Sequence, residues 1–292
     1  MYYHKSVLLK EATDGLNLKY GIYVDGTYGG GGHTAEIAKA AQLVIAIDRD
    51  KEALTNPAPP NVKLIHGNFK DFAKILDGLG ILKIDGMLLD LGMSFHQTNS
   101  PHRGFSYMRN APLDMRMDTA EKLTAKDILH NYSLNDLVKI FKTYGQEPFA
   151  RPIAKAIKKT PPDSTKELAD LILNLTPKKF GLASVKRIFQ AVRIEVNQEL
   201  NIIESTVADA ISRLNIGGRL CIITFHSLED RIVKQSFKKL TNPCACPIEM
   251  PCICTEPSLV KIITKKPVLP REQEIKHNPG AKSAKLRIAE RI

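Results

Sequence analysis

The stretch Val24-Asp25-Gly26-Thr27-Tyr28-Gly29-Gly30-Gly31-Gly32-His33-Thr34 decides the fold. An apolar run that starts at Ile22 leads into it, and a helical pattern from Thr34 to Ala41 leads out. Glycines let the backbone turn tightly here and let a ligand come close to it. A glycine-rich turn can also be a purely structural corner, so this stretch alone does not establish a binding site.

Short apolar runs and helical patterns alternate around this turn. Strands are predicted at 22–25, 43–48, 62–66 and 84–90, and a helix at 69–79. Strands separated by helices of this length form right-handed βαβ units, which build a parallel sheet.

The alternation stops between about Tyr107 and Lys186 and then returns. The middle of the chain has no convincing strand and predicts helices at 123–132, 134–144, 152–159 and 165–175. The later part predicts one long helix, or two in succession, over 189–214, ended by Gly217-Gly218. A strand at 219–225 and a helix at 228–240 should follow. Paired strands at 259–263 and 284–289, joined by a loop, complete the pattern. We therefore expect an α/β, Rossmann-like domain (residues 1–106 and 189–292) interrupted by an all-helical domain (107–188).

The composition is typical of a soluble globular protein, with 43% hydrophobic and 25% charged residues. No run reaches the roughly 18 apolar residues of a membrane span, and the N-terminus lacks the features of a signal peptide. A cytoplasmic protein is expected. The net charge of +11 favours a polyanionic partner such as nucleic acid, although basic side chains also serve solubility alone.

Four of the five cysteines lie close together, at Cys244, Cys246, Cys252 and Cys254. Four thiolates suit tetrahedral zinc, but a gap of one residue within each pair is tighter than zinc sites normally show. Disulfides are the weaker interpretation in a reducing compartment. A structural zinc stays open, and no metal ligand is assigned.

Acidic residues end three of the predicted strands. Asp25, Asp48 and Asp90 should meet at one edge of the sheet, where doubly wound folds bind their ligands. Asp25 precedes the first glycine, where it would favour a cationic ligand and repel a pyrophosphate. S-adenosylmethionine carries an ammonium and a sulfonium, and Asp48 would accept hydrogen bonds from its ribose. Phe69 either packs against an adenine or belongs to the core.

These residues resemble the bacterial methyltransferase H family, which methylates N4 of a cytidine in the decoding region of small-subunit ribosomal RNA. The resemblance runs nearly end to end. Its motifs are the glycine loop and the strings at 4–11, 47–50, 103–106, 112–118, 189–194, 225–231 and 283–287.

The resemblance implies S-adenosylmethionine as cofactor, and small-subunit ribosomal RNA or the assembling 30S subunit as partner. It also implies a helical insertion at this place. One string departs from the family, which usually has Ser-Ser-Pro-Gln where this chain has Met93-Ser94-Phe95-His96-Gln97, so the placement of Gln97 stays open. The implied cofactor contacts are Gly31, Gly32, His33, Asp48, Phe69, Asp90 and Gln97.

A cytosine amine is a poor nucleophile and needs alignment with the methyl group and acceptors for its N–H groups. The Asp/Asn-Pro-Pro-aromatic string of many amine methyltransferases is absent. Asp90, with Ser94 nearby, is the best catalytic candidate by position, and binding of the cofactor alone is its alternative role. His226 either faces the pocket or is a hydrogen-bonded structural residue.

Candidates for RNA contact lie in the middle of the chain. Phe105 and Tyr107 could stack on an unpaired base, or could belong to a core or interface. Arg103, Arg109 and Arg116 could contact phosphates, with a solvated surface as the alternative.

Two other functions share parts of this pattern. A nicotinamide-dependent dehydrogenase would use the same sheet and Asp48, but Asp25 and the missing G-x-G-x-x-G register disfavour it. A non-catalytic RNA-binding ribosome-assembly factor is the second alternative, and an intact cofactor site disfavours it.

Overall fold

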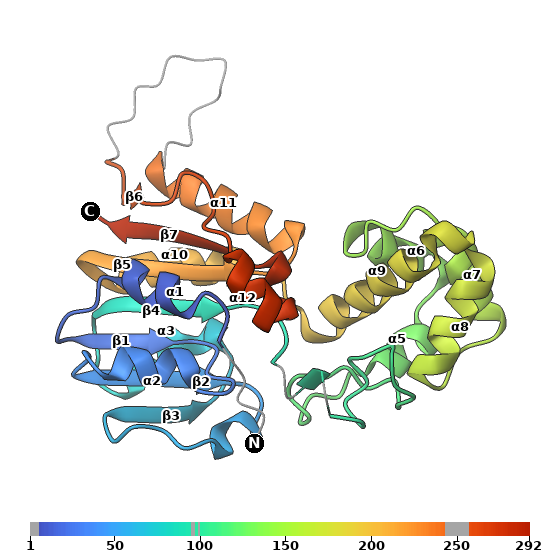
Figure 1. Cartoon of the computed structure of the whole chain (residues 1–292), viewed down its shortest axis with the longest axis horizontal. Helices are drawn as coiled ribbons and strands as arrows, with labels where there is room; N and C mark the ends of the chain where they lie inside the picture. Colours follow the sequence, from blue (N-terminus) through green and yellow to red (C-terminus); the bar gives the residue numbers. More distant parts are fainter. Residues whose placement is uncertain (1–5, 95–96, 99, 243–256) are drawn as a thin grey trace, which may run out of the picture. The chain divides into compact units, whose positions relative to one another are not determined.

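The computed structural model describes residues 6–94, 97–98, 100–242 and 257–292. The chain forms two compact units, residues 1–92 with 200–292, and residues 93–199. Figure 1 shows a sheet covered by helices in the first unit and a group of helices in the second. The expected fold class, α/β with an inserted helical domain, is confirmed.

A seven-stranded sheet in the order β3-β2-β1-β4-β5-β7-β6 is the frame of the first unit. The first five strands in this order are parallel, and β7 runs antiparallel to both β5 and β6. The first four strands have the predicted bounds, because strands buried on both faces give continuous apolar runs. The strands are β1 (Ile22–Asp25), β2 (Leu43–Asp48), β3 (Val62–His66), β4 (Ile84–Asp90), β5 (Leu214–Thr224), β6 (Val260–Ile262) and β7 (Lys285–Arg291).

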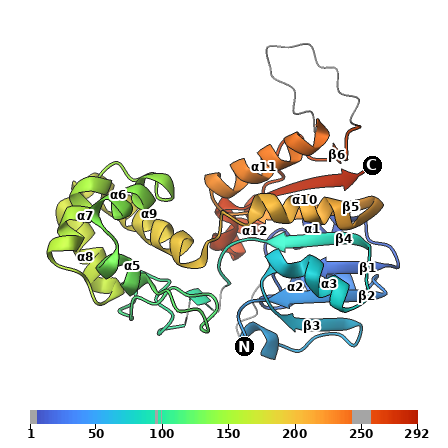
Figure 2. The ribbon, with the colours of Figure 1, turned by 180° about the vertical axis from the view of Figure 1, so that it is seen from behind.

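Helices cover both faces of this sheet. Helices α1 (Leu9–Leu16) and α2 (Gly32–Ala38) pack on one face, with a core that includes Tyr23 and Ile37. Helices α3 (Phe72–Gly78), α10 (Ile203–Arg213) and α11 (Ser227–Thr241) pack on the other face, which Figure 2 turns toward the viewer. The sheet is therefore the middle of three layers.

The predicted role of Gly217-Gly218 is wrong. Helix α10 already ends at Arg213, and the two glycines lie inside β5, where the register against β4 shifts from Ile84↔Leu214 to Gly86↔Arg219. Gly217 has φ +81°, which glycine adopts without strain. The glycines therefore form an irregularity that re-aligns the strand. The expected loop before β7 also contains a short helix, α12 (Glu272–His277).

Five helices with described bounds belong to the second unit, and they bury a core of their own. The predicted helical pattern is confirmed, and the long helix after it begins earlier than predicted. The helices are α5 (Ala125–Asn131), α6 (Leu134–Thr143), α7 (Ala150–Lys159), α8 (Thr165–Leu175) and α9 (Lys178–Asn197). Among the described residues, no helix has both the length and the apolarity that a membrane span needs.

The second unit extends beyond the limits 107–188 that the sequence predicted for the insertion. Its first part has no strand or helix pattern, yet Phe105, Leu113, Met115 and Met117 are buried in the helical core. Helix α9 supplies Val185 and Val192 to the same core. The junctions at 92/93 and 199/200 therefore follow burial, which helical periodicity alone does not report.

Two of the family-like strings meet where β7 packs beside α11. The Arg287 guanidinium donates from Nε and Nη2 to the Asp230 carboxylate, at 2.7 and 3.2 Å. Both side chains are largely buried. Burial raises the pKa of Asp230, but the hydrogen bonds and charges of Arg287 and Lys285 outweigh it and hold the pKa below its ordinary value. A forked ion pair thus joins the last strand to the helix after β5.

We expect Arg287→Met to lower the free energy of unfolding by about 2–4 kcal/mol, because Asp230 would keep its charge in a partly buried place without its main partner. Urea unfolding near neutral pH measures this. Arg231→Met, on the exposed side of α11, is the matched control and should change stability by less than about 0.5 kcal/mol. Equal losses in the two variants would contradict the role of the pair.

Candidate active site

The carboxyl ends of three neighbouring strands bring the predicted acids to one edge of the sheet. β1 lies between β2 and β4, with Asp25 paired to Ala46 and to Leu88 in register. Asp25, Asp48 and Asp90 are the last residues of these strands. The edge is the place where doubly wound sheets bind ligands.

Asp25 is a scaffold for the glycine loop, and its attraction for a cationic ligand stays a prediction. Its side chain is 1% exposed. Oδ2 accepts a hydrogen bond from Thr34 Oγ1 at 2.6 Å, and Oδ1 accepts from Thr27 N at 3.0 Å. Burial raises the pKa of Asp25, and these hydrogen bonds oppose the rise. The carboxylate thus ties the start of the loop to α2.

Thr27, which sequence analysis overlooked, links the loop to the end of β4. Its Oγ1 accepts the backbone N–H of Asp90 at 2.7 Å. The loop therefore fixes the position of Asp90 through Asp25 and Thr27. A threonine inside a glycine-rich turn, two residues after an aspartate, was the signal for this role.

Asp48 holds the middle of the glycine loop. Its Oδ2 accepts from Gly29 N at 2.7 Å, and its Oδ1 accepts from Asp50 N at 2.8 Å. Each carboxylate oxygen has a second lone pair, so these bonds leave acceptor capacity for a ligand. Burial raises the pKa of Asp48, and the two hydrogen bonds oppose this rise.

Gly31 and Gly32 bring the backbone of the loop close to neighbouring side chains, which a Cβ at either position would displace. Gly31 has φ +76°, and a Cβ there would lie 2.8 Å from Tyr28 Oη. A Cβ on Gly32 would lie 2.1 Å from Ser6 Oγ. His33 is buried, and its Nε2 lies 3.0 Å from the carbonyl oxygen of Val7. Ser6 and Val7, in the family-like string at 4–11, therefore lie against the glycine loop.

The surroundings of Asp90 leave part of its carboxyl group without a hydrogen bond. Its Oδ1 is buried and has no hydrogen-bond partner among the described residues. Its Oδ2 lies 3.8 Å from His33 Nδ1. Burial raises the pKa of the Asp90 carboxyl well above its ordinary value, and the charges of Asp25 and Glu229 raise it further. A buried acceptor without a donor normally indicates a ligand or a catalytic role.

His226 is a helix cap, so its structural alternative is confirmed. It precedes α11, and its Nδ1 accepts from Glu229 N at 3.4 Å. In return, Glu229 Oε2 accepts from Phe225 N at 2.8 Å and from His226 N at 3.2 Å. This capping box keeps the buried Glu229 carboxylate near the carboxyl edge, where its charge acts on Asp90. Sequence analysis had not singled out Glu229.

Two further cofactor candidates lie in different surroundings. Phe69 follows β3, is 8% exposed, and packs in the core on the α3 side of the sheet. A Cβ on Gly26 would lie 3.0 Å from Phe69 Cβ, so the start of the Phe69 side chain lies beside the glycine loop. Gln97 belongs to the second unit, where its Oε1 accepts from Ser94 N at 3.1 Å. Their contacts with a cofactor stay predictions.

Two of the arginines proposed for phosphate contact hold the second unit together. The prediction is wrong for Arg103, which is buried, and stays a prediction for the partly exposed Arg116. Arg103 is 3% exposed, and its Nη2 donates to the carbonyls of Arg116 and Met117. Arg116 forms a fork with Asp114 and donates to the carbonyls of Thr119 and Glu121. A segment without regular structure needs such donors for its carbonyl groups.

The two aromatic residues proposed to stack on an RNA base, Phe105 and Tyr107, differ in burial. Phe105 is buried in the helical core, so its core alternative is confirmed. Tyr107 is half-buried and packs edge-to-face on Phe189, with ring centroids 5.8 Å apart.

The cysteines at 244, 246, 252 and 254 lie outside the described residues, as do Phe95 and His96.

Comparisons with known proteins identify relatives over the whole chain. The model of the MraW methylase family matches residues 1–292. A protein of Clostridioides difficile (strain 630) named ribosomal RNA small subunit methyltransferase H is 48% identical, with 100% of this chain and 99% of that protein covered. Proteins with the same name in Clostridium botulinum (strain 657 / Type Ba4) and Halothermothrix orenii are both 47% identical, with at least 99% of each chain covered.

The raised pKa of Asp90 predicts that Asp90→Asn stabilises the fold near neutral pH. Between the ordinary pKa of about 3.9 and the raised folded pKa, the unfolded chain releases a proton that the folded chain keeps, so stability falls as pH rises. Asparagine cannot ionise and escapes this loss. The midpoint temperature of Asp90→Asn should exceed that of the unaltered protein near neutral pH, and the difference should vanish near pH 4.

Thermal unfolding across this pH range measures the effect. Asp209→Asn, on the exposed face of α10, is the matched control and should show no pH-dependent gain. A gain for Asp90→Asn that is equal at all pH values, or a loss near neutral pH, would show that burial does not disfavour the charge.

Proposed function

The chain belongs to the MraW methylase family, and on that premise we propose that it transfers a methyl group from S-adenosylmethionine to N4 of a cytidine in the decoding region of small-subunit ribosomal RNA. The observation that carries this proposal is the carboxyl edge of the sheet, where Asp48 and Asp90 flank a glycine loop and Asp90 Oδ1 is buried without a partner. The names of the curated relatives support the substrate class. The family resemblance, and not the geometry, supplies the cytidine.

The residues at this edge suit S-adenosylmethionine. The cofactor supplies a methyl group that its sulfonium makes electrophilic. Asp48 retains acceptor capacity for ribose hydroxyls, and Gly30 is an exposed residue of the loop beside it. Carboxylates near the site favour the positive charge of the cofactor. We assign the cofactor contacts to Gly31, Gly32, His33, Asp48, Phe69, Asp90 and Gln97.

Asp90 is the proposed catalytic residue. The cytosine amine loses a proton as its nitrogen forms the new N–C bond and the sulfur–methyl bond breaks. The ionised Asp90 carboxylate accepts an N–H of that amine and then its proton. Because burial raises the pKa of Asp90, the ionised form is a stronger base than an exposed carboxylate. His33, whose Nε2 is held by the Val7 carbonyl, orients its Nδ1 toward the same carboxyl group.

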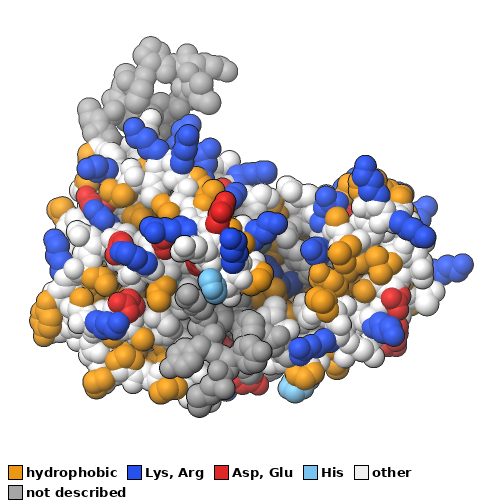
Figure 3. Space-filling model, viewed as in Figure 1, with side chains coloured by type: hydrophobic (Ala, Val, Ile, Leu, Met, Phe, Trp, Pro, Cys, Tyr) orange, Lys and Arg blue, Asp and Glu red, His pale blue; other side chains and the backbone are white. Residues whose placement is uncertain are grey.

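The RNA partner is small-subunit ribosomal RNA, alone or in the assembling 30S subunit, and the reaction takes place in the cytoplasm. The net charge of +11 supports binding to such a polyanion. Figure 3 shows Lys and Arg side chains distributed over the viewed faces of both units.

Transfer of radiolabelled methyl from S-adenosylmethionine to small subunits tests the proposal, with the labelled nucleotide mapped after digestion. The unaltered protein should label a single cytidine. Asp90→Asn should lower kcat at least about 100-fold, because the proton acceptor is lost. Absence of any transfer would support the non-catalytic assembly factor instead.

Calorimetry separates the two roles of Asp90. If Asp90 acts as the base, Asp90→Asn should lower kcat and still bind S-adenosylmethionine within about threefold of the unaltered protein. A pure binding role would instead weaken affinity and leave kcat at saturating cofactor unchanged. Asp48→Asn is the comparison variant. It should weaken cofactor binding about tenfold, because one acceptor becomes a donor toward the ribose and the loop. Unchanged affinity in Asp48→Asn would contradict the cofactor site.

A further inference from the structure

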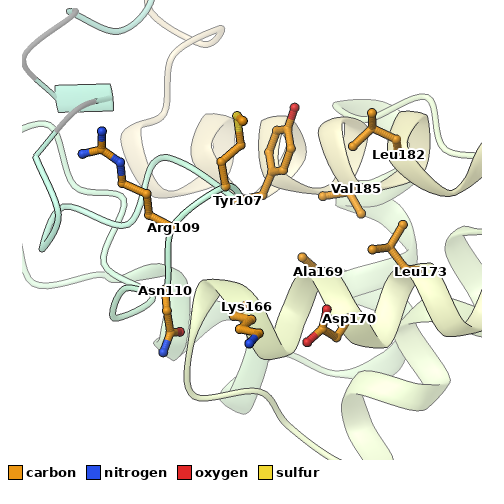
Figure 4. A pocket seen from close by; sticks show the side chains of 10 residues that line it. Tyr107, Arg109, Asn110, Lys166, Ala169, Asp170, Leu173, Leu182 and Val185 are labelled. Atoms are coloured by element: carbon orange, nitrogen blue, oxygen red, sulfur yellow. The ribbon is translucent and has the colours of Figure 1, made fainter.

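The second unit contains a pocket that the methyl-transfer site does not use. Its volume is about 440 Å³, which is within the usual range for small-molecule sites. Figure 4 shows side chains from the segment 107–110, from α8 and from α9 on three sides of the opening. None of the acids at the carboxyl edge lines it.

The walls of this pocket are fixed in place by buried contacts. Thr165, at the start of α8, is 0% exposed. Its Oγ1 donates to the Arg109 carbonyl at 2.6 Å and accepts the N–H of Ala111 at 3.0 Å. Tyr107 is held by its edge-to-face contact with Phe189 of α9. The segment 107–110 therefore keeps a defined distance from both helices.

The lining combines an apolar wall with polar groups. Ala169, Val185 and Leu182 supply apolar surface from α8 and α9, and Leu182 is 54% exposed although it is a large hydrophobic residue. Asn110 and Asp170 supply hydrogen-bond acceptors, and Asn110 also supplies donors. An unpaired nucleobase needs this combination, since its faces are apolar and its edge carries donors and acceptors.

Two cations line the pocket, and further basic residues belong to one of its helices. Arg109 and Lys166 line the pocket, and Lys178, Lys179 and Lys186 lie on α9, the helix that supplies its apolar wall. In Figure 3, hydrophobic and basic side chains share the viewed face of this unit. A phosphodiester on either side of a bound base would meet positive charge.

We propose that this pocket binds one unpaired nucleotide of the RNA substrate, other than the nucleotide that is methylated. The base lies between Tyr107 and the apolar wall, its edge meets Asn110 and Asp170, and its phosphate meets Arg109 and Lys166. This inference rests on the proposed function for the identity of the RNA, and it adds a second point of attachment that selects substrates with an unpaired nucleotide. An apolar peptide segment is the competing occupant.

Two variants test the pocket without altering the core. Leu182→Glu places a negative charge on the exposed part of the apolar wall, and Lys166→Glu reverses a charge at the opening. Each should weaken binding of a fluorescein-labelled single-stranded RNA of about 12 nucleotides by about tenfold. Lys166→Glu should also reduce the salt dependence of binding.

Matched controls make the same chemical changes outside the pocket. Leu175→Glu alters an exposed leucine of α8 that does not line it, and Lys139→Glu reverses an exposed charge on α6. Both should bind the single strand within about twofold of the unaltered protein. The midpoint temperatures of all four variants verify that the second unit remains folded.

Three results would overturn the inference: Leu182→Glu binding the single strand as tightly as the unaltered protein, equal weakening for a blunt duplex of the same length, or equal weakening in the controls. The duplex result would indicate general charge, because a paired base cannot enter a pocket. In methyl transfer to small subunits, the two pocket variants should raise KM for the subunit and leave kcat unchanged. Absence of transfer by the unaltered protein would refute the proposed function, while the binding of single-stranded RNA still decides the pocket.

Discussion

The Asp25 carboxylate accepts hydrogen bonds from Thr27 and Thr34, and Thr27 in turn accepts the backbone N–H of Asp90. This chain of bonds joins the end of β1, the glycine loop and the end of β4. Burying a carboxylate is costly unless hydrogen bonds compensate, so the loop can adopt only conformations that supply those donors. Asp48 fixes the loop from the other side through Gly29. The position of Asp90, and with it the proposed chemistry, follows from these contacts.

Much of this arrangement could be predicted from the sequence, because buried parallel strands produce apolar runs whose last residues point to one edge. The four strands before the insertion, and the acids that end three of them, were placed correctly. The individual partners of each acid could not be predicted. The hydrogen bond between Asp25 and Thr34 was not foreseen, because a strand-end position does not reveal which donors the following loop offers.

The remaining errors have related causes. Arg103 was expected on the surface, but a segment without helix or strand leaves carbonyl groups that need donors, and this arginine supplies them. Gly217-Gly218 was taken for a helix end, although a glycine pair also permits a strand irregularity. Residues 93–106 also lack periodicity, so their membership of the second unit could not be predicted, although Phe105 is buried with the helices of that unit. Each unit therefore has its own core, and the insertion is a domain in its own right with a pocket that the family-level chemistry does not require.

The central claim is that the carboxyl edge of the sheet binds the methyl donor between the glycine loop, Asp48 and Asp90. A crystal structure of the protein with S-adenosylmethionine tests this most directly. The account predicts the ribose hydroxyls within hydrogen-bond distance of Asp48, the backbone at Gly31 against the ligand, and a ligand or substrate donor aimed at Asp90 Oδ1. Density for the ligand elsewhere, or a pocket beside Gly31 closed by side chains in that crystal, would contradict it.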